Sequence, residues 1–321
     1  MIVQNLLYLT GINIAIICLG YWFAHKKLIS ASWFLCLFCG FLIHSVFLSA
    51  PATIRMFALI TTVFMGMKVI TAAVEIRNKP FTLTFPQWLV FCLTWAGMRA
   101  EIFKTAGLES LPGAKRMIVH GILQVMAGVS LVVVAHYLAS VEMNASLQYL
   151  LITSALLIAF CLTLHFGILA ISAGVWRYFG VDTYLLFNEP LKSGTLNEFW
   201  SRRWNIAFSE MTSIAVFRPL KQKIGAIPAL LLAFMFSGVL HEMAISVPVN
   251  KGYGLPMAYF VIQGLAVALE KFLITKNIIR AGNTVIDKIW LFSWLVIPLP
   301  LLFHKPFITG IIWPLAGLHV P

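Results

Sequence analysis

Long apolar runs constrain this chain more than any other feature. A helix needs roughly 20 residues to cross a bilayer, and no stretch shows the alternation typical of a membrane barrel. Hydrophobic residues make up 60% of the 321 residues and charged residues 11%, which lies outside the range of soluble domains. We therefore predict one all-α polytopic membrane domain over residues 1–321, with nine spans near 4–24, 29–49, 52–74, 117–138, 147–176, 226–248, 256–274, 289–303 and 306–319.

The net charge of +12 is explained by the membrane class. Membrane proteins place excess Lys and Arg in cytoplasmic loops, so no nucleic-acid partner is expected. Lys26 and Lys27 follow the first apolar run, which predicts a retained first span with its N-terminus outside. Neither a disulfide framework nor a metal site is expected from the cysteines, all of which lie in apolar stretches: Cys18, Cys36, Cys39, Cys92 and Cys161.

The segment 86–106 is only half apolar, because it contains Arg99, Glu101 and Lys104. The loops on both sides of it are basic, whereas the connection near Glu142 has no Lys or Arg. Both basic loops should be cytoplasmic. The segment then enters and leaves on one side, as a re-entrant or in-plane helix surrounded by protein. The fold expected is a bundle of about nine transmembrane helices plus such non-spanning helices.

The longest polar stretch, 177–224, should face the cytoplasm in this orientation. Its cations outnumber its acids, and Phe199, Trp200 and Trp204 are interleaved with the charges. This pattern suits a helix lying in the headgroup region, with its aromatic rings directed toward the hydrocarbon core and its cations toward water. An interfacial anchor without any chemical role would show the same composition, and that alternative stays open here.

His241 and Glu242 interrupt an otherwise apolar run at 226–248. Two ionisable groups inside a bilayer cost on the order of several kcal/mol unless they are paired or hydrated, so they indicate an intramembrane site. The alternative is a structural histidine hydrogen-bonded to a neighbouring helix. Glu242 could orient His241 or pair with a Lys or Arg, and the sequence favours neither.

Several enzyme classes are excluded by their motifs. Position 245 is Ile, so His241-Glu242 does not continue into the zinc HExxH pattern. Asp182 and Asp287 are the only aspartates, which leaves no aspartate-rich magnesium site. The chain also lacks the nucleophile elbow GxSxG and the phosphate-binding GxxxxGK[ST] and GxGxxG loops. We expect no metal and no bound cofactor.

Two ordered motifs nevertheless resemble a known family. The first reads Phe-Trp-Ser-Arg-Arg-Trp-Asn over 199–205 and is followed by Phe-Arg-Pro over 217–219. The second reads Phe-Met-Phe-Ser-Gly-Val-Leu-His-Glu over 234–242. The pair resembles the wax synthase branch of the membrane-bound O-acyltransferase (MBOAT) superfamily. The resemblance covers mainly 175–250, with a weaker echo at 95–99.

This resemblance implies transfer of an acyl group from a coenzyme A thioester to the hydroxyl of a hydrophobic alcohol. It implies His241 as the catalytic residue and Asn205 as its partner. A neutral histidine can act as a general base, which typically contributes ~10²–10⁴-fold, and the Asn205 amide could donate to the oxyanion or hold the acceptor hydroxyl. Ser237, Glu242 and Phe234 are the candidates for lining the substrate tunnel.

Acyl-coenzyme A is expected as a substrate. Its site needs cations to bind the phosphates and an apolar tunnel to hold the acyl chain. Trp200 and Trp204 are candidates for stacking or lining. The candidates for phosphate contact are Arg202, Arg203, Arg218, Lys221 and Lys223.

Two other functional classes remain open. A lipid or small-molecule transporter or flippase would also carry an intramembrane His-Glu pair, although such proteins are often built from repeated halves, and no repeat is evident. A non-enzymatic scaffold could share the fold. The bilayer is the expected environment, in a bacterial cytoplasmic membrane or the endoplasmic reticulum, and a homo-oligomer is compatible with the sequence.

Overall fold

Helices make up most of the chain that the structure describes. This computed structural model describes residues 2–77, 80–279, 282 and 284–319, and no strand occurs among them. By length and composition, eight helices could cross a membrane: Val3–Lys26, Ile29–Val46, Ala52–Glu75, Ala114–Ser140, Ala145–Tyr178, Ala226–Val249, Leu255–Thr275 and Val285–Leu302. The expected all-α polytopic fold is confirmed.

The prediction of a ninth span over 306–319 is wrong. This segment is divided into three short pieces: α16 (Lys305–Phe307), the π-helical turn η7 (Ile308–Ile312) and α17 (Trp313–Leu315). At 1.5 Å per residue they extend only about 17 Å, roughly half of the hydrocarbon core. Their apolar side chains are buried against other helices. The segment is therefore hydrophobic because it belongs to the protein core.

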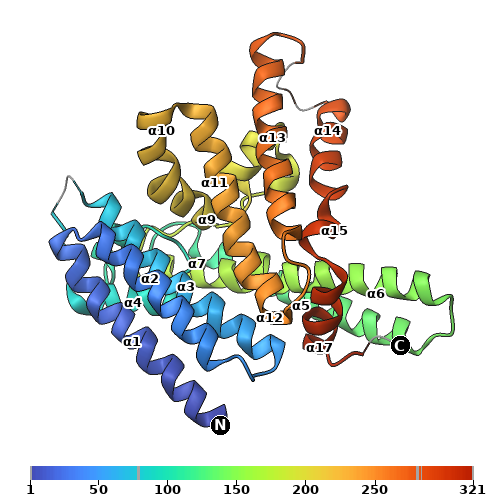
Figure 1. The fold of residues 1–321 in the computed structure, drawn as a ribbon, viewed down its shortest axis with the longest axis horizontal. Coiled ribbons are helices and arrows are strands. Elements are labelled where there is room, and N and C mark those ends of the chain that lie inside the picture. Colours follow the sequence, from blue (N-terminus) through green and yellow to red (C-terminus); the bar gives the residue numbers. More distant parts are fainter. Residues whose placement is uncertain (1, 78–79, 280–281, 283, 320–321) are drawn as a thin grey trace.

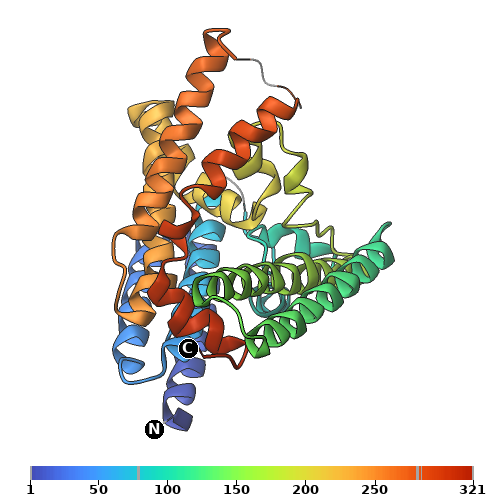
Figure 2. The same cartoon turned by 90° about the vertical axis from the view of Figure 1, so that its right-hand side faces the viewer.

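The helices form three groups (Figures 1 and 2). The N-terminal group packs α1 (Ile2–Lys26) and α2 (Ile29–Val46) against α3 (Ala52–Glu75). The second group is a hairpin that runs across the upright helices in both views. It consists of α5 (Ala114–Ser140), α6 (Ala145–Phe160), η2 (Cys161–Ile168) and α7 (Leu169–Tyr178).

The third group holds the two motifs. Helix α11 (Ala226–His241) packs along α13 (Leu255–Thr275), and the short pieces of the first motif lie beside them. The C-terminal α14 (Val285–Val296) and α15 (Leu299–Leu302) follow. The short pieces of the motif region are α8 (Leu196–Glu198), η4 (Phe199–Arg203), α9 (Ile206–Thr212), η5 (Ser213–Phe217), α10 (Arg218–Ile224), η6 (Glu242–Ser246) and α12 (Val247–Val249).

The segment 86–106 does not span, as predicted. It forms α4 (Phe85–Thr94), which begins at a Thr84 capping box, and the 3₁₀ helix η1 (Ala100–Thr105). Ten residues of α-helix extend only about 15 Å. The C-terminal carbonyls of α4 lack helical partners and must be satisfied inside the bundle.

Lys68 on α3 satisfies those carbonyls. Its side chain is fully buried, and its Nζ donates to the carbonyls of Phe91 at 2.7 Å, Cys92 at 3.0 Å and Trp95. A lysine has three donors, so every one of them has an acceptor here. The ammonium also lies 4.4 Å from the centre of the Phe91 ring. This cation allows a short helix to end within the protein interior.

Cys36 and Cys39 have the C-x-x-C spacing found in many metal and redox sites. Both thiols are free and buried on α2, within an apolar membrane helix. Across the described residues, no group of three His, Cys, Asp or Glu side chains is arranged to hold a metal ion. The pair lies in the hydrophobic core formed with α1 and α3.

Candidate active site

His241 lies where α11 passes into the π-helical turn η6. Its Nδ1 is 2.7 Å from the carbonyl oxygen of Ser237. A carbonyl can only accept, so this bond requires the proton to be on Nδ1, and the neutral ring then presents a lone pair at Nε2. No residue of the described chain hydrogen-bonds to Nε2. The local backbone thus prepares one ring nitrogen to accept a proton.

Aromatic rings surround this imidazole. Phe260 of α13 lies 4.2 Å from His241 and Phe208 of α9 lies 5.4 Å from it, measured between ring centres. The His241 side chain is partly exposed rather than sealed in. Its surroundings are therefore apolar but accessible to a substrate group.

Asn205 starts α9 with a left-handed backbone, φ 44° and ψ 65°. Asparagine tolerates this conformation better than most residues. Its Oδ1 accepts from the backbone N–H of Phe208 at 3.2 Å. The carbonyl half of the amide is thus used to cap a helix, and the Nδ2 donors have no partner in the described part of the chain.

Phe208 connects the two motif residues. Its backbone N–H is capped by Asn205, and its ring packs edge-on against His241. Segments that are separate in the sequence are therefore brought to one place, as the motif pair predicts. Both motif residues therefore contact Phe208, Asn205 through its backbone and His241 through its ring.

Glu242 has neither of the two roles considered from the sequence. Its Oε1 accepts from the backbone N–H groups of Gly254 at 2.8 Å and Met257 at 3.1 Å. These donors lie at the start of α13, where free N–H groups and the helix dipole favour a carboxylate. The bond from Ser237 orients His241 instead, and no described cation forms an ion pair with Glu242.

The other two tunnel candidates have partners within the protein. The hydroxyl of Ser237 is buried and donates to the carbonyl of Ala233 at 3.0 Å. The ring of Phe234 meets Trp200 edge-on at 6.1 Å between centres. Tunnel lining stays a prediction for both residues.

The two motif tryptophans have partners within the protein. Trp200 donates from Nε1 to the Gln263 side chain at 3.1 Å, and its ring packs against Phe260. Trp204 stacks on Phe199 with 5.4 Å between ring centres and 13° between planes. Both rings hold the motif region together, and contact with coenzyme A stays a prediction for each.

The two motif arginines differ in surroundings. Arg203 donates from Nε to Glu198 at 2.6 Å, and its Nη1 lies 3.4 Å from the carbonyls of Asn188 and Glu189. Glu198 also accepts from the N–H of Gly194 at 2.8 Å, which lowers the pKa of its carboxyl, with the Arg203 bond adding to the effect. Arg203 therefore connects Glu198 to the backbone at residues 188–189. Arg202 is exposed and has no ion-pair partner in the described chain.

Arg218 is exposed at the start of α10 and lines a cavity of about 530 Å³. The cavity lies between the end of α3 and the motif region. It contains two arginines and one glutamate, and its lining consists of Val74, Glu75, Arg77, Ile214, Arg218, Pro219 and Gln222. Arg77 was not among the expected site residues.

Glu270 is a second residue that the motifs did not reveal. It is 2% exposed on α13, and it accepts from the N–H groups of Leu196 at 2.9 Å and Asn197 at 3.2 Å. These bonds fix the first turn of the motif region to a membrane helix. A signal was present, because a carboxylate inside the predicted span 256–274 is costly unless it has a structural or functional role.

Glu210 connects α9 to the non-spanning segment. It forms an ion pair with Arg99 at 2.7 Å and accepts from the Tyr184 hydroxyl at 2.5 Å. Burial raises the pKa of Glu210, although the hydroxyl and the arginine oppose this effect. Burial, together with the Glu210 carboxylate, also raises the pKa of Tyr184, which keeps its proton available as a donor. The weak motif echo ending at Arg99 thus contacts α9, the helix that follows the first motif.

Comparison with protein families matches residues 184–262 to the Membrane bound O-acyl transferase family. A "Long-chain-alcohol O-fatty-acyltransferase" from Simmondsia chinensis is 32% identical over 98 residues, which cover 27% of this chain and 28% of that protein. A "Probable long-chain-alcohol O-fatty-acyltransferase 6" from Arabidopsis thaliana is 27% identical over 135 residues, covering 36% of this chain and 39% of the relative. In both cases the match spans well under half of the relative's length.

The matched stretch of 184–262 contains both motifs, the capping Asn205 and the helix with His241. The relatives carry the names of the same branch that the two motifs indicated. These comparisons confirm the resemblance of this chain to the wax synthase branch of the membrane-bound O-acyltransferases.

Proposed function

We propose that this protein is a membrane-bound O-acyltransferase that moves a fatty acyl group from acyl-coenzyme A to the hydroxyl of a hydrophobic alcohol. The observation that carries the proposal is the His241 ring, whose Nδ1 is held by the Ser237 carbonyl and whose Nε2 has no partner in the described chain. The family match and the names of the relatives support the same reaction class.

In this mechanism Nε2 of His241 takes the proton of the alcohol hydroxyl while its oxygen attacks the thioester carbonyl. The C–O bond forms, and the carbonyl oxygen becomes an oxyanion to which Nδ2 of Asn205 donates. The intermediate then collapses, the C–S bond breaks, and the leaving sulfur receives the proton from Nε2. The products are the ester and free coenzyme A, and His241 returns to its starting state.

The cavity at Arg218 is the proposed mouth for coenzyme A. Arg77 and Arg218 can contact phosphate oxygens, and exposed Arg202 can add to this positive field. A cytoplasmic orientation of this end is part of the proposal, because coenzyme A thioesters are cytosolic substrates and basic loops favour that side. Transport of a lipid, the alternative, has no support from the relatives.

The test compares purified wild type, His241→Ala and His120→Ala in detergent, with palmitoyl-coenzyme A and a panel of long-chain alcohols. His120 is an exposed histidine on α5 and serves as the matched control. We expect ester and free thiol from wild type and the control, and a loss of about 10²–10⁴-fold in turnover for His241→Ala.

Each other outcome is informative. Ester formation in detergent excludes a transport explanation, since no compartments exist there. Equal turnover by wild type and a folded His241→Ala variant would remove the general base from the mechanism. A wild-type protein that releases thiol from palmitoyl-coenzyme A without forming ester with any alcohol would contradict the proposed acceptor class.

A further inference from the structure

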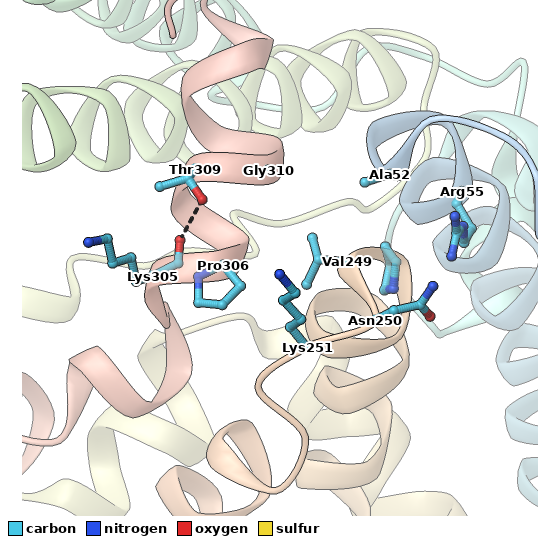
Figure 3. Close-up of a pocket in the computed structure, with 10 residues that line it drawn as sticks. Ala52, Arg55, Val249, Asn250, Lys251, Lys305, Pro306, Thr309 and Gly310 are labelled. Carbon is cyan, nitrogen blue, oxygen red and sulfur yellow. Dashed lines mark hydrogen bonds between the residues drawn. The ribbon is translucent and has the colours of Figure 1, made fainter. Parts of the chain in front are cut away.

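A second cavity lies where the span that carries His241 ends. It is at the opposite end of this span from the cavity of Arg218. Its volume is about 540 Å³ (Figure 3). It lies where the loop after α12 meets the C-terminal segment and the start of α3. Its lining consists of Ala52, Arg55, Pro248, Val249, Asn250, Lys251, Lys305, Pro306, Thr309 and Gly310.

Two helices show that this cavity and the cavity of Arg218 lie at opposite ends of the bundle. Helix α3 places Ala52 and Arg55 at this cavity, and Val74 and Glu75 at the cavity of Arg218. The span Ala226–Val249 begins beside α10, at the Arg218 end, and finishes at this cavity. Each of these helices has 24 residues, which extend about 36 Å and are long enough to cross a bilayer. The two cavities thus belong to opposite ends of the bundle.

The lining of this second cavity carries three cations and no carboxylate. In Figure 3, Lys251 extends between Val249 and Pro306. Lys305 lies 5.9 Å from the centre of the Tyr149 ring. In the described part of the chain, neither lysine forms an ion pair. An anion entering here would meet positive charge from three elements that are far apart in the sequence.

Arg55 is the strongest indication of a ligand. It is 8% exposed, and its Nη2 donates to the carbonyl of Ala50 at 3.1 Å. The Asn250 amide, with its oxygen turned toward Arg55, accepts from Nη1 at 3.0 Å and donates to the carbonyl of Val247 at 3.1 Å. The buried Nε has no partner, and no acidic side chain of the described residues pairs with the guanidinium.

A buried arginine with only neutral partners is costly, because charge that leaves water needs a counter-charge. Lys68 on the same helix shows how neutral carbonyls can satisfy a buried cation, because all three of its donors have acceptors. At Arg55 the Nε donor lacks an acceptor, and no carboxylate of the described residues supplies a counter-charge. The guanidinium is suited to bind a tetrahedral oxyanion through two parallel N–H donors.

We propose that this cavity binds a phosphate group, presented by a lipid headgroup or as the free ion, through Arg55, Lys251 and Lys305. Its volume suits a headgroup-sized ligand. The site is separate from His241, since the chain rises about 14 Å along the helix axis over the nine steps from that residue to Asn250. The proposal does not depend on the acyl-transfer activity.

The test measures binding of dioctanoyl phosphatidic acid to the purified protein in a neutral detergent by native mass spectrometry. Dioctanoylglycerol, which lacks the phosphate, is the ligand control. The variant pair Lys251→Gln and Lys305→Gln removes two exposed charges, and Arg55→Met removes the buried one. The pair Lys271→Gln and Lys276→Gln removes the same number of exposed charges from α13 and the turn that follows it.

We expect phosphatidic acid to bind and dioctanoylglycerol not to bind. The Lys251/Lys305 pair should weaken binding by about tenfold or more, Arg55→Met should weaken it as well, and the α13 pair should change it less than about twofold. Competition by inorganic phosphate at equal concentration would identify a free ion as the ligand, and its failure to compete would identify a headgroup. Equal binding of the neutral lipid, unchanged binding in the Lys251/Lys305 pair, or no binding of either phosphate would overturn the proposal.

Discussion

The two polar segments of the motif region differ in how their side chains are used. In the segment 195–205 most of the polar groups have partners within the protein. Arg203 closes a loop with Glu198, and Trp200 donates to Gln263. In the segment 237–242, the Ser237 hydroxyl and Oε1 of Glu242 also have backbone partners, but Nε2 of His241 and Oε2 of Glu242 have none in the described chain.

This difference indicates which motif residues hold the site and which perform the proposed chemistry. A motif that is rich in charge and indole looks catalytic in sequence, yet most of its side chains are structural. Asn205 stands between the two kinds, because its Oδ1 caps a helix and its Nδ2 is left as a donor. The variants below test this division, beginning with the residue that has both roles.

Asn205→Asp should separate capping from donation. The carboxylate can still accept from the Phe208 N–H, so the fold should be kept. It cannot donate to an oxyanion, so turnover should fall by about 10²–10³-fold. Turnover and melting temperature are measured together, with Asn188→Asp, a change at an exposed asparagine, as the charge-matched control. Wild-type turnover by the Asn205→Asp variant would place Asn205 with the structural residues.

Glu270→Ala should show the largest loss of stability. The change leaves the N–H groups of Leu196 and Asn197 buried without their acceptor, and each such group costs about 1–3 kcal/mol. We expect a total loss of about 3 kcal/mol in unfolding free energy, measured by thermal or denaturant unfolding in detergent. Lys271→Ala, an exposed neighbour, should stay within about 0.5 kcal/mol. Equal stability of the two variants would mean that the motif region does not need this anchor.

Arg203→Gln and Arg202→Gln form a matched pair of adjacent residues. Arg203 donates to a carboxylate, an interaction whose loss costs about 1.5–3 kcal/mol, whereas Arg202 has no such bond. The free energy of unfolding should therefore fall clearly in Arg203→Gln and hardly change in Arg202→Gln. A larger rise in the KM for acyl-coenzyme A in Arg202→Gln would support its role at the donor mouth, and identical behaviour of both variants would contradict the division.

Glu198 should give a small pH dependence of stability. Its pKa is lowered in the folded protein by the Gly194 N–H and by Arg203, so the folded state binds fewer protons than the unfolded state. This stabilisation is present above its ordinary value of 4.5 and is lost as pH falls through the folded pKa. Glu198→Gln should lower the melting temperature at pH 7 and reduce its fall on acidification. An unchanged acid profile would contradict this assignment.

Much of the fold follows from the length of the apolar runs, and two segments needed more than that. The segment 86–106 was predicted not to span because the charges around it left no other consistent arrangement. The segment 306–319 was misjudged because hydrophobicity does not distinguish lipid from protein as the apolar surroundings. Its buried Trp313 and Ile311 face other helices, which no single-chain pattern reveals.

The site shows the same limit. The two motifs brought attention to His241 and Asn205, but the partners that organise them come from other elements. Glu270 and Gln263 on α13 and Arg99 after α4 contact the motif region only after packing. An unusual charge inside a span was the available signal for Glu270 and Lys68, and it did not identify the partner.

By itself the sequence determined the class of the protein, the place of its motifs and the residue types available for chemistry, because these depend on local composition and order. The tertiary structure decided which polar groups are satisfied. That outcome depends on contacts between distant segments, as with Lys68 and the end of α4, or Glu242 and the start of α13. Polar groups with internal partners hold the structure together, whereas Nε2 of His241 and the buried Nε of Arg55 have no partner in the described chain and are the groups that we propose meet a substrate or ligand.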